Sequence, residues 1–180
     1  MIVDTEELQN AAVAGARILR TAIVPHDTPS PLATLRDALG DTPLEIVFLF
    51  VSPQADIHAL AGSVSKVFGA TPVIGCTTAG SLSQLGYSDG MILAVGLPRD
   101  SFRATTLLID DLTDVKGQKL IETMIRSRHD LHRDRPDWPH EFNFVMIDGL
   151  STLEDALTAE MAAGLGPVPL FGGSAGDEDR

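Results

Sequence analysis

One pattern occurs twice in this sequence: an apolar strand, a helix, and a second apolar strand that runs into glycine and small hydroxyl residues. The first copy ends in PVIGCTTAG at residues 72–80, and the second ends in PLFGGSAG at residues 169–176. Twenty positions separate Ser52 from Pro72, and twenty separate Gly149 from Pro169. Equal spacing, with proline and glycine residues at matching positions, predicts two structurally equivalent units. This repeat limits the chain to folds that accept a duplicated strand-helix-strand unit.

Each copy predicts a βαβ unit whose strands are covered on both faces, because the apolar runs lack polar alternation. The predicted elements are a strand at 46–51, a helix at 54–68, a strand at 71–75, and then a strand at 142–147, a helix at 152–163 and a strand at 168–171. We predict an α/β fold with a mixed, mostly parallel sheet flanked by helices. If both copies share one sheet, both glycine turns lie at the carboxyl ends of strands, where open α/β sheets bind ligands.

Four further elements are predicted outside the repeat. They are an N-terminal helix reaching about Thr21, a helix at 32–39 closed by Gly40, an antiparallel hairpin of 91–97 with 102–109, and a helix at 114–128. The hairpin is predicted from the turn-forming residues between its two apolar runs. We divide the chain into an N-terminal helical segment, 1–44, and a domain, 45–180.

Charge and composition exclude several functions. The chain has 25 acidic and 13 basic side chains, a net charge of -12, which repels nucleic acid and anionic lipid. The apolar run 46–51 is too short to cross a bilayer, and the N-terminus is acidic, unlike a signal peptide. We therefore expect a cytoplasmic protein. The single cysteine, Cys76, excludes an internal disulfide.

Residues 172–176 match G-x-S-x-G, the pattern that presents a nucleophilic serine between a strand and a helix. All five histidines precede Ser174, so the usual order of a hydrolase triad is absent. A hydroxyl without a base is a poor nucleophile. A ligand-binding or capping serine is the favoured interpretation, and Cys76 is interpreted as a small buried residue. A hydrolase or transferase using Ser174 or Cys76 stays as the alternative, and it predicts a base within hydrogen-bond reach.

Two other patterns give little support for chemistry. Residues 75–81 have the glycine spacing of a phosphate loop but lack its lysine, so a nucleoside triphosphate is not supported. His129, His132 and His140 form a histidine-rich segment, but arginines alternate with them, which opposes a metal cation. We interpret that segment as a solvated helix end and loop, and expect no metal site.

Asp148 and Gly149 follow a predicted strand directly, and two interpretations stay open. The Asp148 carboxylate either binds a ligand amine or hydroxyl, or belongs to the cap of the next helix, where Ser151 and Glu154 have the spacing of a capping box. Asp177 beside the second turn raises the same question. The expected ligand contacts share small or polar side chains in or beside the turns: Gly75, Cys76, Thr77, Thr78, Gly80, Ser81, Asp148, Gly149, Gly172, Gly173, Ser174, Gly176 and Asp177.

Three motifs together, at residues 73–81, 147–151 and 171–177, resemble the N-terminal part of FIST sensory domains. The resemblance extends to the nitric-oxide-sensing FIST proteins that bind haem, although no haem-ligating histidine can be matched in this sequence. It implies a bacterial, non-enzymatic signal-input domain that binds a small molecule, either haem with nitric oxide or an amino-acid-like metabolite. The implied partner is a signalling protein such as a histidine kinase, a cyclic-di-GMP enzyme or a chemotaxis receptor. Family members continue beyond the last motif, so we expect the domain to be incomplete at its C-terminal end.

Overall fold

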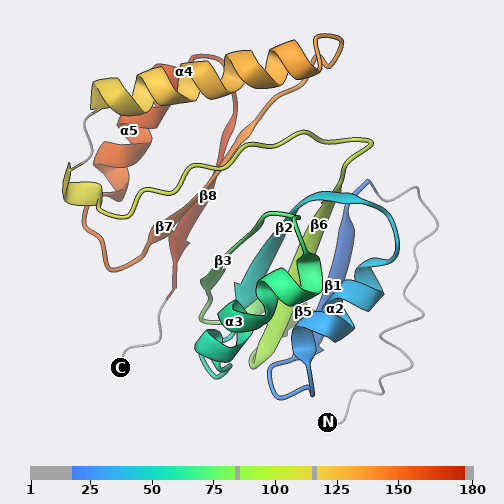
Figure 1. Cartoon of the computed structure of the whole chain (residues 1–180). Helices are drawn as coiled ribbons and strands as arrows, with labels where there is room; N and C mark the ends of the chain where they lie inside the picture. Colours follow the sequence, from blue (N-terminus) through green and yellow to red (C-terminus); the bar gives the residue numbers. More distant parts are fainter. Residues whose placement is uncertain (1–17, 84–85, 115–116, 177–180) are drawn as a thin grey trace.

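The structure is a computed structural model that describes residues 18–83, 86–114 and 117–176 (Figure 1). Its elements, in chain order, are β1 (Arg20–Pro25), α2 (Pro31–Leu39), β2 (Leu44–Val51), α3 (Ile57–Phe68), β3 (Val73–Thr77), β4 (Ser81–Ser83), β5 (Gly86–Ser88), β6 (Met91–Pro98), the 3-10 helix η1 (Leu112–Asp114), α4 (Gly117–Asp134), β7 (Asn143–Asp148), α5 (Glu154–Leu165) and β8 (Leu170–Ala175). The predicted α/β class is confirmed. None of the helices in the described part of the chain has the length and hydropathy needed to cross a lipid bilayer.

The main sheet has four strands in the order β1-β6-β2-β3. β2 and β3 are parallel, whereas β6 is antiparallel to both β2 and β1. The sheet is therefore mixed, and the expectation that it is mostly parallel is wrong. The second copy of the repeat forms a separate parallel pair, β7 with β8. The two copies do not share one sheet: β3 is an edge strand of the main sheet, and β7 and β8 pair only with each other within the described residues.

The predicted hairpin between 91–97 and 102–109 is wrong. β6 pairs instead with β1 and β2, and these two neighbours occupy both of its edges. No edge is left for residues 102–109, which adopt no strand and run as an extended segment from the first half of the molecule to the second (Figure 1).

The predicted N-terminal helix is wrong where it can be compared. Residues 4–17 of that prediction lie outside the described residues, but the chain from Arg20 onward is a β-strand. In β1 the buried residues Ala22 and Val24 alternate with more exposed neighbours, which is the period of a strand. The next helix is confirmed as α2, and it ends at Gly40, whose φ of 81° few other residues adopt. β1 and α2 pack in the same core as the strands after residue 45.

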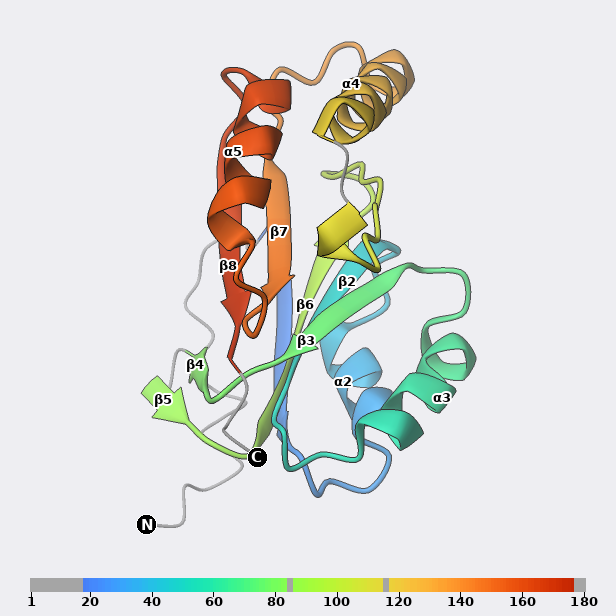
Figure 2. The same ribbon diagram turned by 90° about the vertical axis from the view of Figure 1, so that its left-hand side faces the viewer.

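Two separate apolar cores hold the two halves. The first joins α2 and α3 to one face of the four-stranded sheet, and the second joins α4 and α5 to β7. Phe48 alternates with Val47 and Leu49 of the first core, so its ring lies on the opposite face of the sheet. There it contacts Phe144 of β7 edge-to-face, with 5.1 Å between ring centroids. Figure 2 accordingly shows α2 and α3 on one side of the main sheet and β7, β8 and α5 on the other.

The predicted duplication is confirmed with a shift of one residue, because the strand register makes Ser52 equivalent to Asp148, whereas the equal spacing predicts Gly149. α3 and α5 each have 12 residues, and their first residues lie 97 positions apart. Both helices end at a glycine, Gly69 with φ 60° and Gly166 with φ 61°, and each glycine N–H donates to the carbonyl four residues earlier. The carbonyls of Pro72 and Pro169 then accept the first hydrogen bonds from the preceding strand, at 2.9 and 2.8 Å. The two βαβ units therefore share helix length, helix end and strand entry.

Candidate functional site

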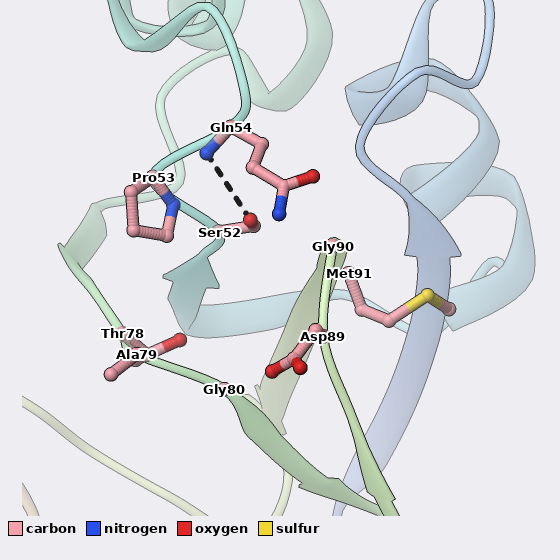
Figure 3. A pocket seen from close by; sticks show the side chains of 9 residues that line it. All are labelled: Ser52, Pro53, Gln54, Thr78, Ala79, Gly80, Asp89, Gly90 and Met91. Carbon is pink, nitrogen blue, oxygen red and sulfur yellow. Dashed lines mark hydrogen bonds between the residues drawn. The ribbon is translucent and has the colours of Figure 1, made fainter. Parts of the chain in front are cut away.

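A pocket lies where the parallel strands β2 and β3 end and β6 begins (Figure 3). Its lining residues are mostly small or polar: Ser52, Pro53, Gln54, Thr78, Ala79, Gly80, Asp89, Gly90 and Met91. Its volume is about 10 Å³, which is room for about one water molecule. This is the edge at which α/β sheets bind ligands, because the carboxyl ends of parallel strands meet there.

Backbone hydrogen bonds that continue the sheet hold the pocket walls. Ser52 N donates to the carbonyl of Met91 at 3.0 Å, and Thr78 N donates to the carbonyl of Val51 at 3.0 Å. The Ser52 side chain is buried, and its hydroxyl oxygen accepts a hydrogen bond from Gln54 N at 3.2 Å. The polar groups of the pocket are thus positioned by regular strand pairing rather than by a free loop.

Thr78 carries the most informative atom of the site. Its hydroxyl oxygen is buried and has no hydrogen-bond partner within the described part of the chain. Figure 3 shows this oxygen pointing into the pocket. Buried polar atoms are nearly always satisfied, and one that is not needs an explanation. Asp89 lies across the pocket in the turn between β5 and β6, exposed and with no hydrogen bond or ion pair among the described residues.

His26 lies behind the pocket wall, although its sequence context gave it no role. Its backbone N–H donates to the carbonyl of Gly90 at 2.7 Å. A Cβ on Gly90 would lie 3.2 Å from the His26 ring and 3.5 Å from the Gln54 side-chain oxygen. A glycine at this position therefore lets the imidazole and the amide approach the pocket closely.

Asp148 occupies in the second half the place that Ser52 occupies in the first. One Asp148 carboxylate oxygen accepts from Leu150 N at 3.0 Å, just as the Ser52 hydroxyl accepts from Gln54 N. Each side chain therefore closes the same local turn at the end of the first strand of its copy. Asp148 is exposed and does not line the pocket.

The helix-cap interpretation of Asp148 is wrong. α5 has Leu153 as its N-cap residue, without a side-chain hydrogen bond. Ser151 is two residues too early to cap it, and Glu154 is instead the first residue of the helix. The predicted capping box is therefore absent. Asp177 lies outside the described residues.

The two glycine turns are also a correction, because most of their residues belong to strands. β3 continues through Gly75 to Thr77, and β8 continues through Gly172 to Ala175. A Cβ on Gly75 would lie 2.5 Å from the carbonyl oxygen of Leu49, and one on Gly172 only 1.8 Å from that of Val145. These equivalent glycines let neighbouring strands approach closely, so a glycine-rich sequence here favours tight pairing and not a turn.

The chain leaves the two strands only at Thr78 and at Gly176. There the two strand ends meet, because a Cβ on Gly176 would lie 3.3 Å from the Cβ of Ala79. Among the predicted contacts, Thr78 and Gly80 line the pocket. Ser81 begins β4. The predicted contacts that do not line it are Gly75, Cys76, Thr77, Asp148, Gly149, Gly172, Gly173, Ser174 and Gly176.

Sequence reasoning predicts two of the nine lining residues and misses seven, of which Ser52, Gln54 and Asp89 have polar side chains. The spacing of the repeat places Ser52 at the strand end equivalent to Gly149, one residue after Asp148, and this is the sequence signal that could have found it. Asp89 belongs to the turn before β6, and only the pairing of β6 with β2 places it beside Thr78.

Ser174 and Cys76, the nucleophiles of the alternative enzyme hypothesis, differ in whether a possible base lies near them. Ser174 Oγ donates to Glu154 Oε1 at 3.1 Å, so a carboxylate does approach this exposed serine. No histidine hydrogen-bonds to Ser174 or Cys76 within residues 18–83, 86–114 and 117–176. An activated serine needs a base that a third group orients. In the same residues, no three His, Cys, Asp or Glu side chains gather closely enough to hold a metal ion.

Burial raises the pKa of the Cys76 thiol, because the thiolate is poorly solvated there. The neutral thiol stabilises the folded state fully below the pKa of the unfolded thiol, and this contribution is lost as the pH rises through the folded pKa. We therefore expect Cys76 to react with iodoacetamide more slowly in the folded chain than in guanidinium chloride at pH 8. The rate should reach half its maximum at a higher pH in the folded chain. Equal pH profiles would contradict this expectation.

Comparison with known proteins identifies one family. The family model described as the FIST N domain matches residues 45–180. No curated protein and no solved structure matches the chain. The match spans both βαβ units, the pocket and the segment that joins the two halves. The chain therefore belongs to the FIST family of sensory domains.

Proposed function

We propose that this chain is a non-enzymatic signal-input domain that binds a small polar molecule at the pocket of Ser52, Thr78 and Asp89. The observation that carries the proposal is the buried, unpartnered hydroxyl of Thr78 at the carboxyl edge of two parallel strands. A hydroxyl left unsatisfied in the sheet costs about 1–3 kcal/mol. A ligand that hydrogen-bonds to the Thr78 hydroxyl removes this cost, and the removal favours binding.

The chemistry of the pocket favours a ligand with a protonated amine. The Asp89 carboxylate accepts hydrogen bonds and attracts a cation, and the Thr78 hydroxyl accepts or donates. A volume of about 10 Å³ accommodates an ammonium head group and little else. The rest of the ligand then extends past the rim at Gly80. An amino-acid-like metabolite has this combination of a small charged head and a larger body.

Haem does not fit this pocket. A porphyrin is far larger than a site with room for about one water molecule. Among the described residues that line the pocket, Met91 is the single side chain of a type that ligates haem iron, and the other lining groups are polar or small. We therefore propose a polar metabolite, and not haem, as the ligand of this pocket.

The position of the pocket gives a route for a signal. Thr78–Gly80 follow directly on β3, and the Ala79 carbonyl accepts a hydrogen bond from Tyr87 Oη at 3.1 Å. Ala79 also contacts Gly176 at the end of β8. A ligand that favours one arrangement of residues 78–80 shifts the contact between the two halves, and so the affinity for a partner. A histidine kinase or a cyclic-di-GMP enzyme is the partner that the family resemblance suggests.

The Thr78→Val substitution should affect ligand binding without lowering the stability of the free protein. Valine keeps the shape of threonine without its polar atom, so we expect the free protein to be unchanged or slightly more stable. We expect the proteinogenic amino acids and their decarboxylated amines, screened one by one, to include a compound that raises Tm. The rise should be about 5–10 °C at a concentration roughly 100 times its Kd. Thr78→Val should abolish that rise.

Asp89→Asn tests the charge of the site in the same assay. It should reduce the rise in Tm most strongly for amines, while Asp137→Asn, at an exposed carboxylate in the loop after α4, should leave it unchanged. Two results would count against the proposal: a Thr78→Val protein that is clearly less stable without ligand, or binding that both pocket variants retain.

A further inference from the structure

Residues 104–109, called here the linker segment, are extended but pair with no strand. Their sequence, ATTLLI, has the composition of a strand, with no charge, glycine or proline. Leu107 and Leu108 are 53% and 82% exposed. Between Thr105 and Leu108, no backbone group forms a hydrogen bond within the described part of the chain. Such a strand edge is open to pairing, and proteins usually block it with lysine, proline or a covering element.

Both ends of the linker segment are anchored. At one end, Glu45 accepts hydrogen bonds from Arg103 at 3.2 Å and from Ala104 N at 3.3 Å. Arg103 Nε also donates to Asp134 of α4 at 2.8 Å. At the other end, Ile109 packs against the second core. The segment is therefore held extended before any partner arrives, which reduces the conformational entropy lost on binding.

We propose that the linker segment pairs with the same segment of a second copy of this chain, as a two-stranded antiparallel ribbon. A twofold axis between Thr106 and Leu107 places Thr105 opposite Leu108 of the second copy. The same register places Arg103 opposite Asp110, once at each end of the ribbon. Asp110 is exposed and has no ion pair among the described residues.

Charge selects this arrangement over the parallel one. In a parallel pair, Asp110 would face Asp110, and like charges directly opposite each other destabilise a sheet. In the antiparallel pair, Asp110 instead lies opposite Arg103, whose guanidinium already pairs with Glu45 and Asp134 but keeps its Nη2 without a hydrogen bond among the described residues. The contact is the same on both copies, as in most homodimers. The ribbon also covers Leu107 and Leu108, which are exposed in the single chain.

The first test measures dimerisation by sedimentation velocity at 150 mM salt, from about 1 to about 500 µM protein, because so small an interface is weak. We expect reversible dimers. Leu108→Lys should raise the dimer Kd about tenfold or more, because lysine on an edge strand opposes pairing. Leu150→Lys is the matched control, since Leu150 is an equally exposed leucine outside the ribbon, and it should leave the Kd unchanged.

The second test fixes the register by disulfide formation in a Cys76→Ser background. Residues opposite each other in an antiparallel pair lie within disulfide range. A mixture of Thr105→Cys and Leu108→Cys chains should form the mixed disulfide at least tenfold faster than either chain forms its own. A chain that stays monomeric at all concentrations, or a Kd that Leu108→Lys does not change, would overturn the proposal. Equal cross-linking of the single variants and the mixture would overturn it as well.

Discussion

Replacing Gly172 by alanine is expected to destabilise the chain by about 3 kcal/mol or more, among the largest effects of any single substitution here. A Cβ at this position would lie 1.8 Å from the carbonyl oxygen of Val145, and the glycine φ of 134° is itself unfavourable for other residues. The clash is with backbone, so β7 and β8 must separate to relieve it. Urea unfolding followed by circular dichroism measures the loss.

The strand offers a matched control. Gly173→Ala adds the same methyl group one residue later, where nothing lies within 4 Å, so it should be neutral or slightly stabilising. Gly75→Ala should behave like Gly172→Ala in the first half, with a smaller effect because its φ is ordinary and its Cβ would lie 2.5 Å from the Leu49 carbonyl oxygen. Equal stabilities of the Gly172 and Gly173 variants would show that the two strands do not pair as described.

Leu35→Ala and Leu165→Ala should each cost about 2–5 kcal/mol, because each removes a fully buried side chain and leaves a cavity. The two leucines belong to different cores: Leu35 of α2 lies in the first core, and Leu165 of α5 lies in the second. We therefore expect their effects to be local as well as large. Leu150→Ala, at an exposed leucine, should cost less than about 0.5 kcal/mol.

Hydrogen exchange read by mass spectrometry distinguishes local from global loss. Leu165→Ala should speed exchange in α4, α5, β7 and β8 and leave β2 and β6 protected, since regions with separate cores can open separately. Leu35→Ala should give the reverse pattern. Uniform acceleration in both variants would mean that the two cores unfold as one unit.

The sequence was sufficient for the local parts of the fold. Uninterrupted apolar runs with equal spacing predicted both βαβ units. The predicted end of the first helix, Phe68, is the last residue of α3, whereas α5 extends two residues beyond the predicted end of the second helix. Pairing between distant segments was not predictable in the same way. The apolar sequence of β6 does not indicate which strands it pairs with. One of its partners, β1, lies in a segment whose hydrophobic pattern also suits a helix.

The candidate site was predicted only where it is continuous with a motif. Thr78 and Gly80 follow the first repeated phrase, and both line the pocket. Ser52 follows β2 and Asp89 lies in the turn before β6, so their proximity depends on the pairing of these two strands. The glycines were assigned to turns because glycine is common there, but close approach of two backbones requires the same residue.

Two contacts between the halves join matching positions of the repeat. Phe48 pairs with Ile74 in the first sheet and Phe144 with Phe171 in the second, so the two phenylalanines that touch are counterparts. Ala79 and Gly176, which also touch, lie 97 positions apart like the helix ends. The two βαβ units therefore face each other through counterpart residues, although β1, α2 and β6 of the first half have no equivalent among the described residues of the second. A shift of one βαβ unit at these contacts acts on the matching residues of the other unit.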